Sequence, residues 1–123
     1  MIEKIIKSGV GWRVGWNHED NPYQGLIGTD FWTVELTKLE LHDFCYFLTE
    51  LTKVLTEIST ELMEEEKITI DMESERLWIQ LHGYPHDYHV YFILQNERKF
   101  EGTLSSNIIP ELLANLQQII KSL

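Results

Sequence analysis

The sequence predicts an α+β fold in which antiparallel strands lead into an amphipathic helix and the same unit is then repeated. Residues 10–36 and 68–104 contain short runs in which apolar and polar residues alternate. Each group precedes a segment whose apolar residues recur every three or four positions, the first ending near Leu62 and the second spanning 107–123. Alternation indicates half-buried strands, and the longer period indicates amphipathic helices. A chain of 123 residues fits one domain, which we expect over residues 1–123.

Three antiparallel strands are predicted in the first half, at residues 10–17, 23–28 and 31–36. A polar run that contains Pro22 ends the first strand, and a turn that contains Gly28 and Asp30 separates the second from the third. The first and third strands each place three apolar residues on one face: Trp12, Val14 and Trp16, then Trp32, Val34 and Leu36.

The first helix begins at a capping box, Thr37-Lys38-Leu39-Glu40. In this motif the threonine hydroxyl accepts from the amide of the glutamate, whose carboxylate reaches back to the cap. The acidic run 64–66 would oppose the negative end of the helix dipole, so we expect the helix to end near Met63. An apolar stripe follows the cap and consists of Leu41, Phe44, Leu48, Leu51, Leu55, Ile58 and Leu62. Several charged residues are expected outside this stripe: Glu40, Asp43, Glu50, Lys53 and Glu57.

The second half predicts a four-stranded meander over residues 68–104 and a final helix capped by Ser106 or Asn107, with Pro110 in its first turn. Two of these strands carry apolar bulk on both faces, because Trp78, Tyr91 and Ile93 lie opposite the apolar sets. A sheet covered on one side alternates more cleanly. Either the helices are sandwiched within a bent sheet or a second chain covers the outer face, so a homodimer is one expectation.

The charge and composition of the chain limit the classes of function that we expect for it. Residues 1–62 and residues 63–123 each hold ten acids and five bases, so the net charge of −10 is evenly spread. Nucleic-acid binding needs clustered Lys and Arg, which this sequence lacks outside Arg98-Lys99, although a local patch could still form. No apolar stretch approaches the ~20 residues that span a bilayer, and the start does not resemble a signal peptide. A single cysteine, Cys45, allows no internal disulfide, so a cytoplasmic location is expected.

Few residue clusters suggest chemistry. His82, His86 and His89 could hold a divalent metal, but their spacing is equally that of a polar hairpin tip, which we favour. His42 and Asp43 could act as an acid–base pair only if a cleft faced them, and we expect a solvated helix face instead. Cys45 lies beside the apolar stripe and is expected to be a buried structural thiol.

Glycines alternate with tryptophans over residues 9–16, which superficially resembles a phosphate-binding loop. The segment lacks the helix and the lysine of such loops, so core packing is the favoured interpretation. The alternative is that Trp12, Arg13 and Trp16 form a stacking platform for single-stranded nucleic acid.

Seven short strings carry a resemblance: they are residues 11–17, 23–28, 32–37, 62–68, 81–86, 101–102 and 110–113. Together they resemble a small cyanobacterial family catalogued as domain of unknown function 1818. The resemblance covers nearly the whole chain and implies a fold similar to the single-stranded-DNA-binding regulator domains of the Whirly type, in which a four-strands-then-helix unit is repeated. The first half here shows three clear strands, which leaves its fourth open. The resemblance implies no activity, substrate or site.

We therefore expect a non-enzymatic cytoplasmic domain, without catalytic residues, cofactor or metal, that acts by binding a protein partner or itself. The expected contact surface is either the outer sheet face with Trp78, Tyr91 and Ile93 or the hairpin tip Tyr84-Pro85-His86. The alternative function is single-stranded nucleic-acid binding through the platform of Trp12, Arg13 and Trp16 together with the basic pair Arg98-Lys99. No membrane role is expected.

Overall fold

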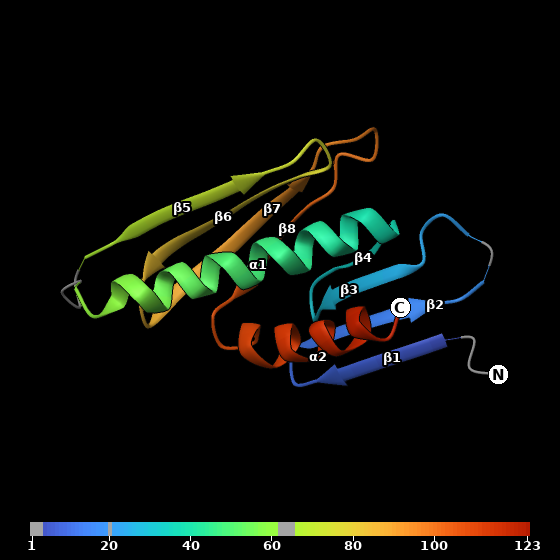
Figure 1. Ribbon diagram of the computed structural model, residues 1–123, viewed down its shortest axis with the longest axis horizontal. Coiled ribbons are helices and arrows are strands. Elements are labelled where there is room, and N and C mark those ends of the chain that lie inside the picture. The colour runs from blue at the N-terminus through green and yellow to red at the C-terminus, as the bar shows by residue number, and fades with distance from the viewer. Residues whose placement is uncertain (1–3, 20, 62–65) are drawn as a thin grey trace.

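The computed structural model describes residues 4–19, 21–61 and 66–123 (Figure 1). The predicted α+β class is confirmed, because two four-stranded antiparallel sheets each lead into one helix. The elements, in order, are β1 (Lys4–Gly9), β2 (Trp12–Asn17), β3 (Gly25–Thr29), β4 (Thr33–Leu36), α1 (Lys38–Ser59), β5 (Ile68–Glu73), β6 (Leu77–Tyr84), β7 (Asp87–Leu94), β8 (Glu101–Ser105) and α2 (Ile109–Lys121).

Both sheets are simple meanders, with strand orders β1-β2-β3-β4 and β5-β6-β7-β8. The strand missing from the sequence prediction is β1, which pairs with β2 from Lys4 opposite Asn17 to Gly9 opposite Trp12. Its residues are mostly polar or exposed, so they show no alternation of apolar residues. Lysines are common on edge strands, because their charge prevents pairing with another chain. The four-strands-then-helix unit is thus present in both halves.

Helix α1 starts as its capping box predicts. The Glu40 amide donates to Thr37 Oγ1 at 3.1 Å, and the Thr37 amide donates to Glu40 Oε1 at 2.8 Å. The helix ends earlier than predicted, at Ser59 with Thr60 as its C-cap, and Met63 lies outside the described residues. Hydroxyl groups in the last turns bond back to helix carbonyls, as Ser59 Oγ does to Thr56, and such bonding weakens a helix.

Helix α2 starts two residues later than predicted. Its N-cap is Ile108, which makes no side-chain capping bond, so neither Ser106 nor Asn107 is the cap. Asn107 is instead engaged in the preceding loop, where its amide oxygen accepts from Ser105 Oγ. Pro110 lies in the first turn, as predicted.

The two helices lie side by side and share one core. Helix α1 crosses the β5–β8 sheet, and α2 lies over β1 and β2 (Figure 1). A single apolar cluster includes Val14 and Ile27 from the first sheet, Leu51 from α1, and Ile79 and Phe92 from the second sheet. No helix within the described residues is long and apolar enough to cross a membrane.

Trp32 joins the two sheets. It lies just before β4 rather than within it, and its ring packs edge-on against Phe92 and Phe100, with centroids 5.4 and 5.5 Å away. Its Nε1 donates to the Thr103 carbonyl of β8 at 3.1 Å. The indole can approach this closely because residue 102 is glycine, and a Cβ there would lie 2.9 Å from Trp32 Cε2.

Replacing Gly102→Ala should therefore destabilise the protein, because aromatic rings must move on both sides of the added methyl group. We expect a loss of about 1–3 kcal/mol in the free energy of unfolding, the range for overpacked cores. Urea denaturation measures it. Ser8→Ala, on the exposed strand β1, is the control and should change stability by less than ~0.5 kcal/mol. Equal stability of the two variants would show that Trp32 does not pack tightly on β8.

Candidate functional site

The side of the β5–β8 sheet that is turned away from α1, here called the outer face, carries the predicted contact residues. Among the described residues, neither helix covers it, since α1 packs on the side of Leu77, Ile79 and Leu81. The strand registers arrange the outer face in three rows across the sheet: Glu73, Trp78, Ile93 and Glu101; Asp71, Gln80, Tyr91 and Thr103; and Thr69, His82, His89 and Ser105.

An aromatic pair lies at the centre of the outer face. Trp78 and Tyr91 meet edge to face with their ring centroids 5.8 Å apart, and both side chains are half-buried, as is Ile93. The indole Nε1 of Trp78 donates to Asp71 Oδ2 at 3.1 Å. Mutual packing of these side chains explains how apolar bulk is accommodated on a face that neither helix covers.

Three carboxylates flank this pair, and each is held by a neutral donor. Besides Asp71, Glu73 Oε2 accepts from Gln95 Nε2 at 3.0 Å. Glu101 interacts with Tyr91: the hydrogen bond to the carboxylate raises the pKa of Tyr91, and desolvation and the negative charge of Glu101 act in the same direction. Within the described part of the chain, none of the three forms an ion pair.

The outer face continues into a groove of about 370 Å³, here called the tip groove. His89, Thr103 and Ser105 belong to both. The opposite rim comes from two hairpin tips of the first sheet, and it carries Val10 and Phe31, which are 93% and 94% exposed. Sequence reasoning missed both residues by assigning them to strands, although a valine and a phenylalanine beside turn residues were a visible signal.

The second predicted surface, Tyr84-Pro85-His86, is a separate hairpin tip. Tyr84 and His86 are stacked with centroids 6.3 Å apart, and Lys67 Nζ lies 5.7 Å from the Tyr84 ring centroid. Pro85 borders a hollow beside the two helices together with Leu113. Strand alternation places Tyr84, which pairs with Asp87, on the same side of the sheet as Trp78 but three rows away, beyond His82, and Pro85 and His86 lie in the turn.

The predicted stacking residues are not gathered on a surface. Trp12 and Trp16 are only 6% and 5% exposed, and their Nε1 atoms donate to Glu111 at 3.0 Å and to His18 at 3.3 Å. Arg13 points to the opposite face of β2 and donates to Thr33 Oγ1. The two tryptophans pack in the core, which was the favoured interpretation of the sequence.

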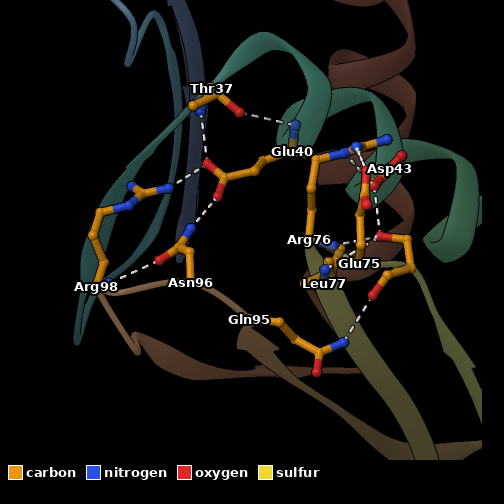
Figure 2. Close-up of polar contacts among 10 residues, drawn as sticks. Thr37, Glu40, Asp43, Glu75, Arg76, Leu77, Gln95, Asn96 and Arg98 are labelled. Atoms are coloured by element: carbon orange, nitrogen blue, oxygen red, sulfur yellow. Dashed lines mark hydrogen bonds and ion pairs between the residues drawn. The ribbon is translucent and has the colours of Figure 1, made fainter.

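Glu40 is buried at 3% exposure, which corrects the expectation that it lies on a polar helix face. Besides its capping contacts, its carboxylate accepts from Arg98 and Asn96 in the β7–β8 loop (Figure 2). Arg98 also donates to the Glu35 carbonyl, and its guanidinium lies 4.4 Å from the centroid of the Tyr23 ring. The ion pair thereby joins the two halves of the chain.

Asp43 is likewise engaged structurally, which corrects the expectation of a solvated helix face. Its Oδ2 accepts from Ser74 Oγ at 2.7 Å and from Arg76 Nε at 3.0 Å, which ties α1 to the β5–β6 turn (Figure 2). The Nε2 atom of the adjacent His42 is buried and has no hydrogen-bond partner among the described residues. Asp43 and His42 thus do not form an acid–base pair.

The three histidines of the second sheet do not gather at one site. His82 and His89 are directly opposite on β6 and β7, and His82 Nδ1 is 2.7 Å from Thr69 Oγ1. His86 lies in the turn against Tyr84. Across residues 4–19, 21–61 and 66–123, no three His, Cys, Asp or Glu side chains gather as ligands of one metal ion.

Comparison with known proteins places the chain within a family. The model of the family described as "Domain of unknown function (DUF1818)" matches residues 7–119. A crystal structure of a protein of unknown function from the DUF155 family of Prochlorococcus sp. NATL2A is similar, with a TM-score of 0.87 and 24% identity, and the match covers 94% of this chain and 98% of that one. This likeness shows the fold alone. Among curated proteins, none matches.

Glu40→Gln should destabilise the protein, because it removes the charge that pairs with Arg98 while keeping a side chain that can complete the capping box. We expect a loss of about 2 kcal/mol, less than for a fully buried pair, since the Arg98 side chain is 27% exposed. Urea denaturation measures it, with the exposed Glu35→Gln as the matched control. A loss no larger than that of the control would contradict the structural role of the pair.

Cys45 should react slowly with thiol reagents in the native protein. The side chain is buried, and burial raises the pKa of its thiol, while hydrogen bonding with Thr49 acts in the opposite direction. Reaction with a disulfide reagent at pH 8 should therefore be limited by unfolding and should accelerate by orders of magnitude in denaturant. Rapid modification without denaturant would show an accessible, activated thiol.

Proposed function

The chain belongs to the DUF1818 family, and we propose that it is a non-enzymatic binding domain that contacts another polypeptide, a protein partner or a second copy, through the outer face and the tip groove. The family description names no activity, so the proposal is supported by the distribution of side chains on the surface. A cytoplasmic location is part of it, since the single cysteine suits a reducing compartment.

The observation that carries the proposal is the exposure of Val10 and Phe31 on the rim of one groove. Two large apolar side chains with more than nine-tenths of their surface in water cost hydration free energy, which association would recover. Because the groove shares residues with the outer face, the exposed apolar rim, the groove and the aromatic pair make one continuous surface. Clustered apolar and aromatic side chains of this kind are typical of protein contact sites.

Two further features support a binding role rather than catalysis. The buried acid Glu40 is neutralised by Arg98, and Asp43 is held by Arg76, so both carboxylates stabilise the fold. The chain's acidity and the burial of Trp12 and Trp16 favour a polypeptide over single-stranded nucleic acid as the ligand, since neither indole offers a free face for stacking.

The proposal predicts that contact depends on the groove rim. The double variant Val10→Ser plus Phe31→Ser should lose a partner that the wild type retains, or should become a monomer if the partner is a second copy. Affinity capture from a native extract, with quantitative mass spectrometry, measures the first outcome, and size-exclusion chromatography with light scattering measures the second.

A matched control comes from two apolar residues of α1, Leu39 and Tyr46, which are 58% and 59% exposed. Leu39→Ser plus Tyr46→Ser removes similar apolar area elsewhere and should leave both readouts unchanged. The proposal would be contradicted if the wild type is a monomer and captures no protein that the Val10→Ser plus Phe31→Ser variant fails to capture. Saturable, salt-sensitive quenching of tryptophan fluorescence by oligo-dT would support the nucleic-acid alternative instead.

A further inference from the structure

We infer that the partner of the outer face is a positively charged, extended polypeptide segment, whose arginine or lysine side chains lie over Trp78 and Tyr91 between the flanking carboxylates. This inference rests on the proposed function and narrows it, because it specifies the chemistry of the partner.

The charge of the outer face is of one sign. Its three rows contain Asp71, Glu73 and Glu101 and no lysine or arginine. Three nearby cations have partners of their own: Arg76 pairs with Asp43 and Glu75, Arg98 pairs with Glu40, and Lys67 Nζ lies 5.7 Å from the centroid of the Tyr84 ring. Three rows that carry acids and neither lysine nor arginine are electrostatically complementary to a cationic partner. The net charge of −10 would also raise the association rate of such a partner.

The aromatic pair adds a second means of recognition. A guanidinium or ammonium group over the face of a tryptophan or tyrosine is attracted by the π-electrons, and tryptophan is the strongest of these acceptors. Asp71 is bonded to the indole of Trp78, and Glu101 to the hydroxyl of Tyr91, so each ring has a carboxylate at its polar edge. A cation placed on either ring could therefore contact π-electrons and a carboxylate together, which one acidic residue alone does not offer.

The same charges argue against a second copy on this face. A two-fold axis places the same patch of both chains together, so Asp71, Glu73 and Glu101 of one chain would meet three rows with the same acids and neither lysine nor arginine. Like charges opposed across an interface cost several kcal/mol in general. The outer face is thus better suited to a different, basic protein than to self-association.

The dimensions fit a short extended segment. Four strands spaced ~4.8 Å apart make a face about 14 Å wide, which an extended chain crosses in about four or five residues. The tip groove lies at the β8 side of this face, and its rim carries Val10 and Phe31. A basic segment with an apolar side chain at one end would place its cations over the aromatic pair and its apolar residue in the groove.

A synthetic probe tests the inference directly. We would titrate the full chain into a fluorescein-labelled twelve-residue peptide in which arginine alternates with serine and one end carries leucine, and follow anisotropy at 150 mM salt. The same peptide with glutamate, or with glutamine, in place of arginine provides the comparison. The inference predicts saturable binding of the arginine peptide, at least tenfold weaker binding of the other two, and weakening at higher salt.

Charge-matched variants separate the outer face from the acidic surface in general. Glu73→Gln plus Glu101→Gln should weaken binding of the arginine peptide at least tenfold. Glu57→Gln plus Glu61→Gln, on exposed positions at the end of α1, changes the net charge equally and should alter it less than twofold. Trp78→Leu, which keeps an apolar side chain but removes the π-electrons, should weaken binding about fivefold or more.

The outcomes distinguish failure of the inference from failure of the proposed function. Equal weakening by the two charge variants, or absence of binding by the arginine peptide, overturns the inference. If the glutamine peptide binds instead and Val10→Ser plus Phe31→Ser abolishes that binding, the surface binds polypeptides but not through charge, so the proposed function stands without the inference. Binding of the arginine peptide that is weakened by the Glu73 and Glu101 changes and by Trp78→Leu, but not by the Glu57 and Glu61 changes, supports the inference.

Discussion

The buried ion pair between Glu40 and Arg98 is the contact on which the arrangement of the two halves depends. The glutamate completes the capping box of α1, so the ion pair is built at the start of the first half's helix. The arginine comes from the β7–β8 loop and also binds the Glu35 carbonyl of β4. A carboxylate that is 3% exposed is tolerated only when cations and hydrogen bonds compensate its lost hydration. The loop between β7 and β8 is thereby fixed against the first sheet.

This constraint positions the proposed contact surface. Strands β7 and β8 supply Tyr91, Ile93 and Glu101 to the outer face, and Trp32 holds β8 beside the first sheet through the Thr103 carbonyl. The tip groove exists only because the two sheets meet there, since its walls come from both. The charged side chains differ in their surroundings. Arg76 and Arg98 form ion pairs within the chain, whereas the acids of the outer face are exposed to solvent.

The sequence predicted the features that depend on neighbouring residues. The capping box at Thr37, the alternation of β5 to β8 and the apolar stripe of α1 are local patterns. The first two are present in the structure, and the stripe is buried from Leu41 to Leu55, while its predicted end, Leu62, lies outside the described residues. Strand β1 was missed because an edge strand with Lys4 and Lys7 has no alternating apolar signal. The burial of Glu40 could not be predicted, because its cation lies 58 positions away. The tip groove joins hairpin tips from both halves, and their proximity is a property of tertiary structure alone.

We infer that the two repeated units unfold as a single cooperative body, because they share one core. Native-state hydrogen exchange in increasing urea tests it most directly, because it reports the opening free energy of each strand separately. Because the core is shared, we expect the slowest amides of β2 and β3 and those of β6 and β7 to open with the same free energy and the same urea dependence. If one sheet opened at clearly lower free energy while the other stayed protected, the two units would be separate bodies and would not unfold cooperatively.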